Sequence, residues 1–117
     1  MAQLGLLYGR GLGTPQDYQQ ARKWFEKGAA AGDRTAMSNL GHIYEMGLGV
    51  PQDYQQARQW YEKAAAEGEP YSMFHLGRLY ESGHGVPRNI VLARQWYEKG
   101  ADAGNQDAEE RLETLPE

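Results

Sequence analysis

Apolar and polar residues follow one another along most of the chain with the spacing of an amphipathic helix. Between residues 34 and 46, apolar or small side chains recur every three or four positions, at Ala36, Met37, Leu40, Ile43 and Tyr44. The same spacing returns between residues 54 and 67, at Tyr54, Ala57, Tyr61, Ala64 and Ala65. Helix-breaking residues separate the two stretches, at Gly47, Gly49 and Pro51. The pattern therefore predicts two helices joined by a turn, each with one buried face.

This pair of helices recurs along the chain with a period of 36 residues. Trp24, Trp60 and Trp96 stand at that interval, and the segments that start at Gly11, Gly47 and Gly83 carry nearly the same residues around them. A unit of this length cannot bury its own apolar face, so successive units are expected to stack into a solenoid. We expect a single domain over residues 1–117, made of a partial unit (1–32), two full units (33–68 and 69–104) and a capping helix within 105–117.

The predicted fold class is all-α, an α/α solenoid of about seven helices, because no segment shows the sustained period-two alternation of a strand. The expected helices cover residues 2–10, 18–31, 34–46, 54–67, 70–82, 90–103 and 106–114. Asp33, Asp53 and Asn89 stand where N-cap residues are needed, and Gln56, three residues after Asp53, resembles the second half of a capping box. Gly68 stands where a left-handed residue ends a helix.

Two recurring features predict how the helices pack. Gly41 and Gly77 lie in the middle of predicted helices, where each glycine costs about 1 kcal/mol relative to alanine. We expect an aromatic ring, a Trp or Tyr from the second helix of the unit, to fill the space that a Cβ would occupy. The three recurring tryptophans stand beside the apolar face of that helix, so they are predicted to be core residues.

The two ends of the array differ in character. The last predicted helix carries Glu109 and Glu113 where the inner units carry packing residues, which is typical of a solvent-facing cap. The first predicted helix instead carries Leu4, Leu6 and Leu7 with no preceding unit in the chain to cover them. This apolar edge predicts self-association into a weak homodimer, unless an upstream segment covers it or the helix frays.

A set of recurring residues gives the unit a family resemblance. The middle unit carries Ala36, Leu40, Gly41, Tyr44, Gly47, Gly49, Val50, Asp53, Ala57, Trp60, Tyr61, Ala64, Ala65 and Gly68. This pattern resembles the Sel-one-like repeat, a relative of the tetratricopeptide repeat. The resemblance implies a right-handed superhelix of helix pairs, in which the first helices of the units line a concave face that binds proteins or peptides.

Positions that differ between units, on helices that are otherwise alike, are the candidate binding residues. Aligned columns include Gln3, Asn39 and His75, then Leu6, His42 and Arg78, and then Gly9, Glu45 and Glu81. Their spacing places them on one stripe of each first helix, so that the stack would form a polar and aromatic groove. The candidate partner-binding residues are Asn39, His42, Glu45, Met46, Phe74, His75, Arg78 and Glu81. The alternative interpretation is ordinary variation on a solvated face.

Composition and charge exclude several function classes. The formal net charge of −4 comes without a basic stripe, which argues against nucleic acid as a partner. No stretch is long and apolar enough for membrane insertion, and the absence of cysteine excludes a disulfide framework. The three histidines match no zinc spacing, and the chain has no P-loop, nucleophile elbow or dinucleotide-binding motif. We therefore expect no catalytic residue, no metal site and no cofactor.

Two functional hypotheses remain after these exclusions. The first is a non-catalytic scaffold or adaptor that binds a peptide or partner protein along the concave face. The second is a structural module that self-associates through its N-terminal edge. The compartment stays open: cytoplasmic, or periplasmic or secreted if a longer parent chain carries a signal.

Overall fold

The computed structural model describes residues 15–115, and this part of the chain is entirely helical apart from its turns. Its six helices are α2 (Pro15–Ala30), α3 (Arg34–Met46), α4 (Tyr54–Ala66), α5 (Pro70–Ser82), α6 (Ile90–Asp102) and α7 (Gln106–Thr114). They agree with the predicted ranges to within a few residues. The helix expected at 2–10 and the leucines at positions 4, 6 and 7 lie outside the described residues.

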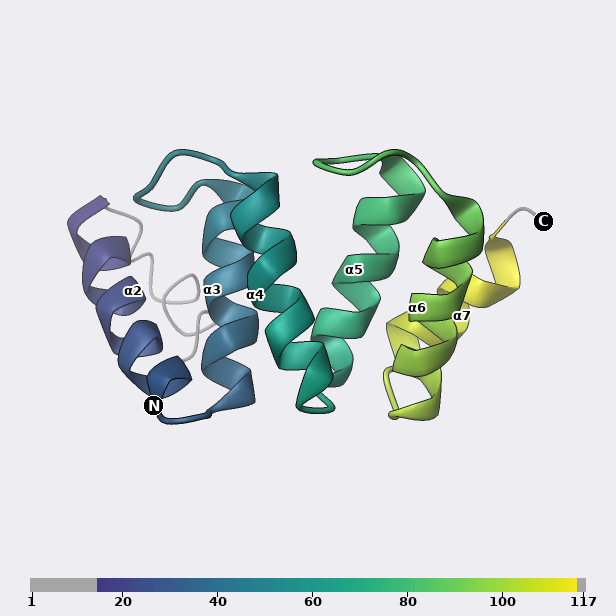
Figure 1. The fold of residues 1–117 in the computed structure, drawn as a ribbon, viewed down its shortest axis with the longest axis horizontal. Helices are drawn as coiled ribbons and strands as arrows, with labels where there is room; N and C mark the ends of the chain where they lie inside the picture. The colour runs from purple at the N-terminus through teal and green to yellow at the C-terminus, as the bar shows by residue number, and fades with distance from the viewer. Residues whose placement is uncertain (1–14, 116–117) are drawn as a thin grey trace.

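The helices follow one another along the long axis of the molecule (Figure 1). Each packs mainly on its neighbours in sequence, most extensively within the pairs α3–α4 and α5–α6. We call α3, α5 and α7 the A helices and α2, α4 and α6 the B helices. The A helices α3 and α5 also contact each other, although α4 lies between them in the sequence. The stack of helical pairs confirms the predicted solenoid arrangement, and the handedness of its superhelix stays a prediction.

Side-chain caps and glycines fix the ends of the helices. Asp33 accepts hydrogen bonds from the backbone N–H groups of Thr35 and Ala36 at the start of α3. Asp53 caps α4 through the N–H of Gln56, but no side-chain bond returns from Gln56, so only half of the predicted capping box forms. The predicted left-handed residue Gly68 has a φ of 85°. The sequence therefore predicts the caps correctly in most cases, because each depends on residues close together in the chain.

The core consists of three successive clusters, each formed between neighbouring helices. Phe25 of α2 packs with Leu40 and Ile43 of α3. Tyr61 of α4 packs with Leu76 and Leu79 of α5, and Tyr97 of α6 packs with Ala108 of α7 and with Leu115. The outward carboxylates Glu109, Glu110 and Glu113 of α7 are exposed, as expected for a capping helix.

The recurring tryptophans are not core residues, so this prediction was wrong. Trp24 is 61% exposed, whereas the next residue, Phe25, is fully buried. Trp60 and Trp96 are only partly buried and cover the Phe25 and Tyr61 clusters of the preceding helices. One residue along a helix corresponds to a rotation of about 100°. The aromatic residue after each tryptophan therefore occupies the centre of the buried face, and the tryptophan itself lies at its edge.

The mid-helix glycines do face aromatic rings, and the rings belong to tyrosines. A Cβ added to Gly41 would lie 2.6 Å from Cδ1 of Tyr61, and one added to Gly77 would lie 2.5 Å from Cε1 of Tyr97. Real non-bonded carbon atoms pack at about 3.5–4.0 Å. Glycine at these positions thus permits the close approach of each A helix to the B helix that follows it.

Candidate functional site

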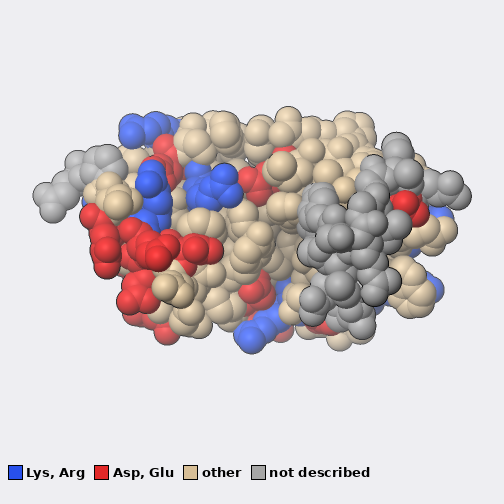
Figure 2. All heavy atoms as spheres, turned by 180° about the vertical axis from the view of Figure 1, so that it is seen from behind, with Lys and Arg blue, Asp and Glu red and all other residues tan. Residues whose placement is uncertain are grey.

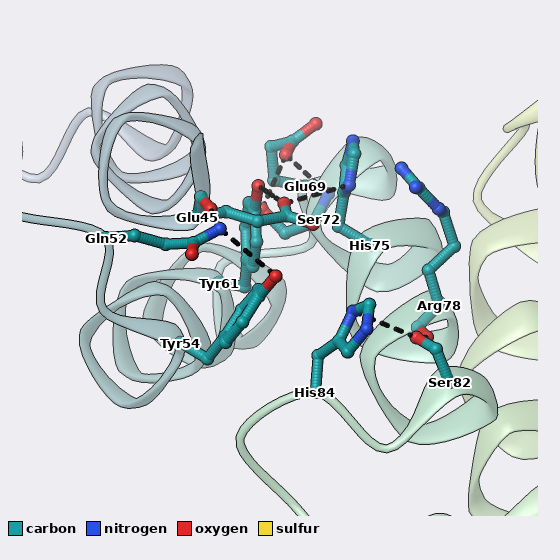
Figure 3. Close-up of polar contacts among 10 residues, drawn as sticks. All are labelled: Glu45, Gln52, Tyr54, Tyr61, Glu69, Ser72, His75, Arg78, Ser82 and His84. Carbon is teal, nitrogen blue, oxygen red and sulfur yellow. Dashed lines mark hydrogen bonds and ion pairs between the residues drawn. The ribbon is translucent and has the colours of Figure 1, made fainter. Parts of the chain in front are cut away.

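Three side chains from three helices form a buried polar cluster beneath the surface of the A helices. The Tyr61 hydroxyl of α4 donates a hydrogen bond of 2.7 Å to Oε1 of Glu45 in α3. The His75 Nδ1 atom of α5 lies 3.5 Å from the same oxygen, and its ring stacks on the Tyr61 ring with centroids 5.1 Å apart (Figure 3). Glu45 is 8% exposed and His75 is 4% exposed. Neither of these two predicted groove residues is available for direct contact with a partner in this conformation.

The same arrangement recurs one unit later with a different base. The Tyr97 hydroxyl donates a 2.7 Å hydrogen bond to Oε1 of Glu81, and the Arg111 Nε donates one of 2.9 Å to the same oxygen. A second Arg111 nitrogen pairs with Oε2 of Glu81. Arg111 stands 36 residues after His75, just as Glu81 follows Glu45. Each cluster therefore links the acid of one A helix, the tyrosine of the next B helix and the base of the following A helix.

The two acids of these clusters remain ionised more readily than ordinary carboxyl groups. Burial would raise the pKa of Glu45, but the side chains of His75 and Tyr61 hold the pKa below its usual value. The Arg111 guanidinium lowers the pKa of Glu81, with a smaller contribution from Tyr97. The Glu81–Arg111 ion pair thus links the A helices α5 and α7, and the hydrogen bond of Tyr61 to Glu45 links α4 to α3.

We expect the Glu81 cluster to make stability depend on pH. Because the pKa of Glu81 lies below its usual value of 4.5 in the folded chain, ionised Glu81 stabilises the fold above that value and the contribution is lost as the pH falls through the lowered pKa. Chemical denaturation from about pH 6 down to pH 3 should show a smaller fall in unfolding free energy for Glu81→Gln than for the wild type. Glu98→Gln, on the exposed side of α6, is the matched control. Equal pH profiles for Glu81→Gln and the wild type would contradict this expectation.

The remaining predicted residues are more accessible. Arg78 is exposed and Met46 is 56% exposed, whereas Asn39, His42 and Phe74 are partly buried. Burial, followed by the nearby His75, lowers the pKa of His42, whose ring centroid lies 6.2 Å from that of His75. Phe74 also packs against the Tyr97 cluster, with ring centroids 5.8 Å apart, so it has a structural role as well.

An open pocket of about 360 Å³ brings three of the predicted residues together. Its lining consists of Phe74, Arg78, Glu81, Ser82, His84 and Arg111. The predicted residues of α3, namely Asn39, His42 and Met46, do not line it. Arg111 was not among the predicted residues, although its register with Asn39 and His75 was a usable signal. His84 was not predicted either, because it lies in the loop after α5, where it stacks on Tyr54 with ring centroids 4.9 Å apart.

Two kinds of feature are absent from the described part of the chain. Within residues 15–115, no three His, Cys, Asp or Glu side chains are grouped so that they could hold a metal ion. None of the described helices has the length and apolar character that a membrane crossing requires.

Comparisons with known proteins agree with the repeat pattern. A family model described as the Sel1 repeat matches residues 1–33, 35–69 and 70–105. A protective antigen of uropathogenic Escherichia coli, with an SLR fold, is 35% identical over 96% of this chain, with a TM-score of 0.81. A Sel1 repeat protein from Oxalobacter formigenes is 34% identical over 93%, with a TM-score of 0.79, and the cysteine rich protein B of Helicobacter pylori is 28% identical over 81%, with a TM-score of 0.76.

The chain spans 24%, 44% and 71% of the lengths of these three structures, respectively. No curated protein matches it significantly. Sel1 repeat proteins generally act as scaffolds for protein interactions and are generally not enzymes. Three family matches that together cover most of the sequence, and solved structures of the same fold at more than 30% identity, lead to one assignment. The chain belongs to the Sel1 repeat family.

Proposed function

We propose that this chain is a non-catalytic scaffold that binds a peptide, or an exposed segment of a partner protein, along the concave surface of its A helices. The observation that carries the proposal is the pocket between α5 and α7, where Phe74 and Arg78 are accessible beside the Glu81–Arg111 pair. An aromatic ring and arginines beside it are the residue types that contribute most to binding at protein interfaces.

The division between constant and variable positions also supports the proposal. Several residues that are constant among the units, such as Leu40, Gly41 and Ala57, are buried and have a packing role. Arg78 and Met46 vary between units and are exposed on A helices. Variation on a solvated face remains the competing interpretation, and it predicts that no ligand prefers this surface.

A peptide library provides the test of the proposed function. The full 117-residue chain would be panned against random dodecapeptides, and binding of an enriched peptide would be measured by fluorescence anisotropy. We expect Phe74→Ala to weaken binding by roughly tenfold or more. Val91→Ala removes a 67% exposed apolar side chain from the B helix α6 and serves as the matched control. Circular dichroism would show that both variants are folded at the assay temperature; equal affinities would count against the A-helix surface.

A second candidate function, self-association at the N-terminal end, is favoured by the exposure of Trp24. Its equivalents Trp60 and Trp96 are partly covered by contact with the preceding clusters, whereas Trp24 borders an open hollow with Lys23 and Lys27. The proposed edge at Leu4, Leu6 and Leu7 lies outside the described residues.

Sedimentation velocity over a range of concentrations separates the second candidate from the first. Self-association predicts a dimer that forms as concentration rises and that Leu6→Glu or Trp24→Glu shifts toward monomer. A wild-type chain that stays monomeric throughout the range would rule out this candidate and leave peptide binding unaffected.

A further inference from the structure

The pocket between α5 and α7 contains two arginines in different electrostatic situations. Both carboxylate oxygens of Glu81 contact the Arg111 guanidinium, so these two charges offset each other. The guanidinium of Arg78 makes no hydrogen bond and no ion pair with any residue of the described part of the chain. The pocket therefore has one positive charge that no protein carboxylate pairs with directly.

The position of Arg78 is suited to binding an anionic group. Its guanidinium carbon lies 6.0 Å from the centroid of the Phe74 ring, one helical turn earlier in α5. Figure 3 shows the side chain extending from α5 beside His75, with no dashed line to its guanidinium. A guanidinium held near an aromatic face keeps its N–H donors free for the two oxygens of a carboxylate.

The surrounding charge limits which acidic partners could bind. Asp107, Glu109, Glu110 and Glu113 are all exposed on α7, and Figure 2 shows acidic side chains gathered toward this end of the molecule. The chain also carries a net charge of −4. A segment with many acidic residues would be repelled, whereas a segment with a single acid would meet a complementary charge at Arg78.

Building on the proposed function, we propose that the partner segment is extended and carries one aspartate or glutamate side chain that pairs with Arg78. The apolar part of the segment lies on Phe74. This assigns the specificity of the surface to Arg78 and Phe74 of α5.

The peptide library tests this partner chemistry separately from peptide binding itself. We expect the peptides enriched on the wild-type chain to share one aspartate or glutamate side chain at a fixed position. Arg78→Gln should weaken binding of such a peptide by about tenfold or more, and Arg78→Glu should reverse the preference toward lysine at the acidic position. Lys63→Glu, on the exposed side of α4, is the matched charge reversal and should leave affinity unchanged. Melting curves would show that each variant is folded.

The possible outcomes distinguish the two proposals. Enriched peptides without an acidic preference, or equal affinities for Arg78→Gln and the wild type, would overturn the inference while peptide binding stands. Binding that requires a free peptide C-terminus, and is lost on amidation, would also overturn it, because the anion would then be the terminal carboxylate. Failure of the wild-type chain to enrich any peptide would overturn both proposals.

Discussion

Replacement of Tyr61 by alanine is expected to lower the free energy of unfolding by about 3 to 5 kcal/mol, the usual range for truncation of a large buried aromatic residue. The Tyr61 side chain is fully buried, its ring packs against Gly41 and His75, and its hydroxyl donates to Glu45. Truncation would therefore leave a cavity and would also remove a hydrogen bond from a buried carboxylate. Urea denaturation, followed by circular dichroism, would measure the change.

Trp24→Ala is the natural control for this prediction. Trp24 has a larger side chain than Tyr61, but it is 61% exposed, so its truncation should change the unfolding free energy by less than about 1 kcal/mol. A greater loss of stability for Trp24→Ala than for Tyr61→Ala would contradict the assignment of the core to the residue that follows each tryptophan.

The second large effect is expected from the smallest substitution, Gly41→Ala. At an exposed position in a helix this change stabilises by about 1 kcal/mol. At Gly41 the new Cβ would lie 2.6 Å from two carbons of the Tyr61 ring, which is buried and cannot move aside. We expect a net destabilisation of about 1 to 3 kcal/mol, as for other overpacked sites. Urea denaturation would measure it.

A double-mutant cycle identifies the ring as the cause of the Gly41→Ala effect. In the Tyr61→Ala background the ring is absent, so Gly41→Ala should become neutral or stabilising through helix propensity. If Gly41→Ala lowered the unfolding free energy equally in both backgrounds, the close approach of α3 to Tyr61 would not be the reason that glycine occupies position 41.

Much of the fold could be predicted because its signals are local or periodic. Asp33 and Gly68 act on backbone groups within a few residues, and the recurrence of Gly41 and Gly77 indicated an aromatic contact. Periodicity alone does not show whether Trp60 or Tyr61 is the core residue, because the two are adjacent, recur together and both border the apolar face of the helix. Only the packing of α4 on α3 and α5 places the centre of the buried face at Tyr61.

The candidate site was predictable only in part. The column positions identified Phe74, Arg78 and Glu81, which do line one pocket. Glu45 and His75 stand in the same aligned columns as the predicted groove residues, but both are buried. The packing of neighbouring helices decides which residues of a helix face are covered, and the column pattern does not show this. The pairing of Glu81 with Arg111 joins residues that are 30 positions apart, and a comparison of columns within units does not reveal contacts between units.

The central claim is that the A helices form the binding surface of this scaffold. The most direct measurement is a ¹H–¹⁵N chemical-shift titration of the full chain with an enriched library peptide. We expect the shifts to cluster on α3, α5 and α7, with the largest changes around Phe74, Arg78 and Arg111. Shifts concentrated on the B helices α4 and α6, or around Trp24 in α2, would contradict the claim.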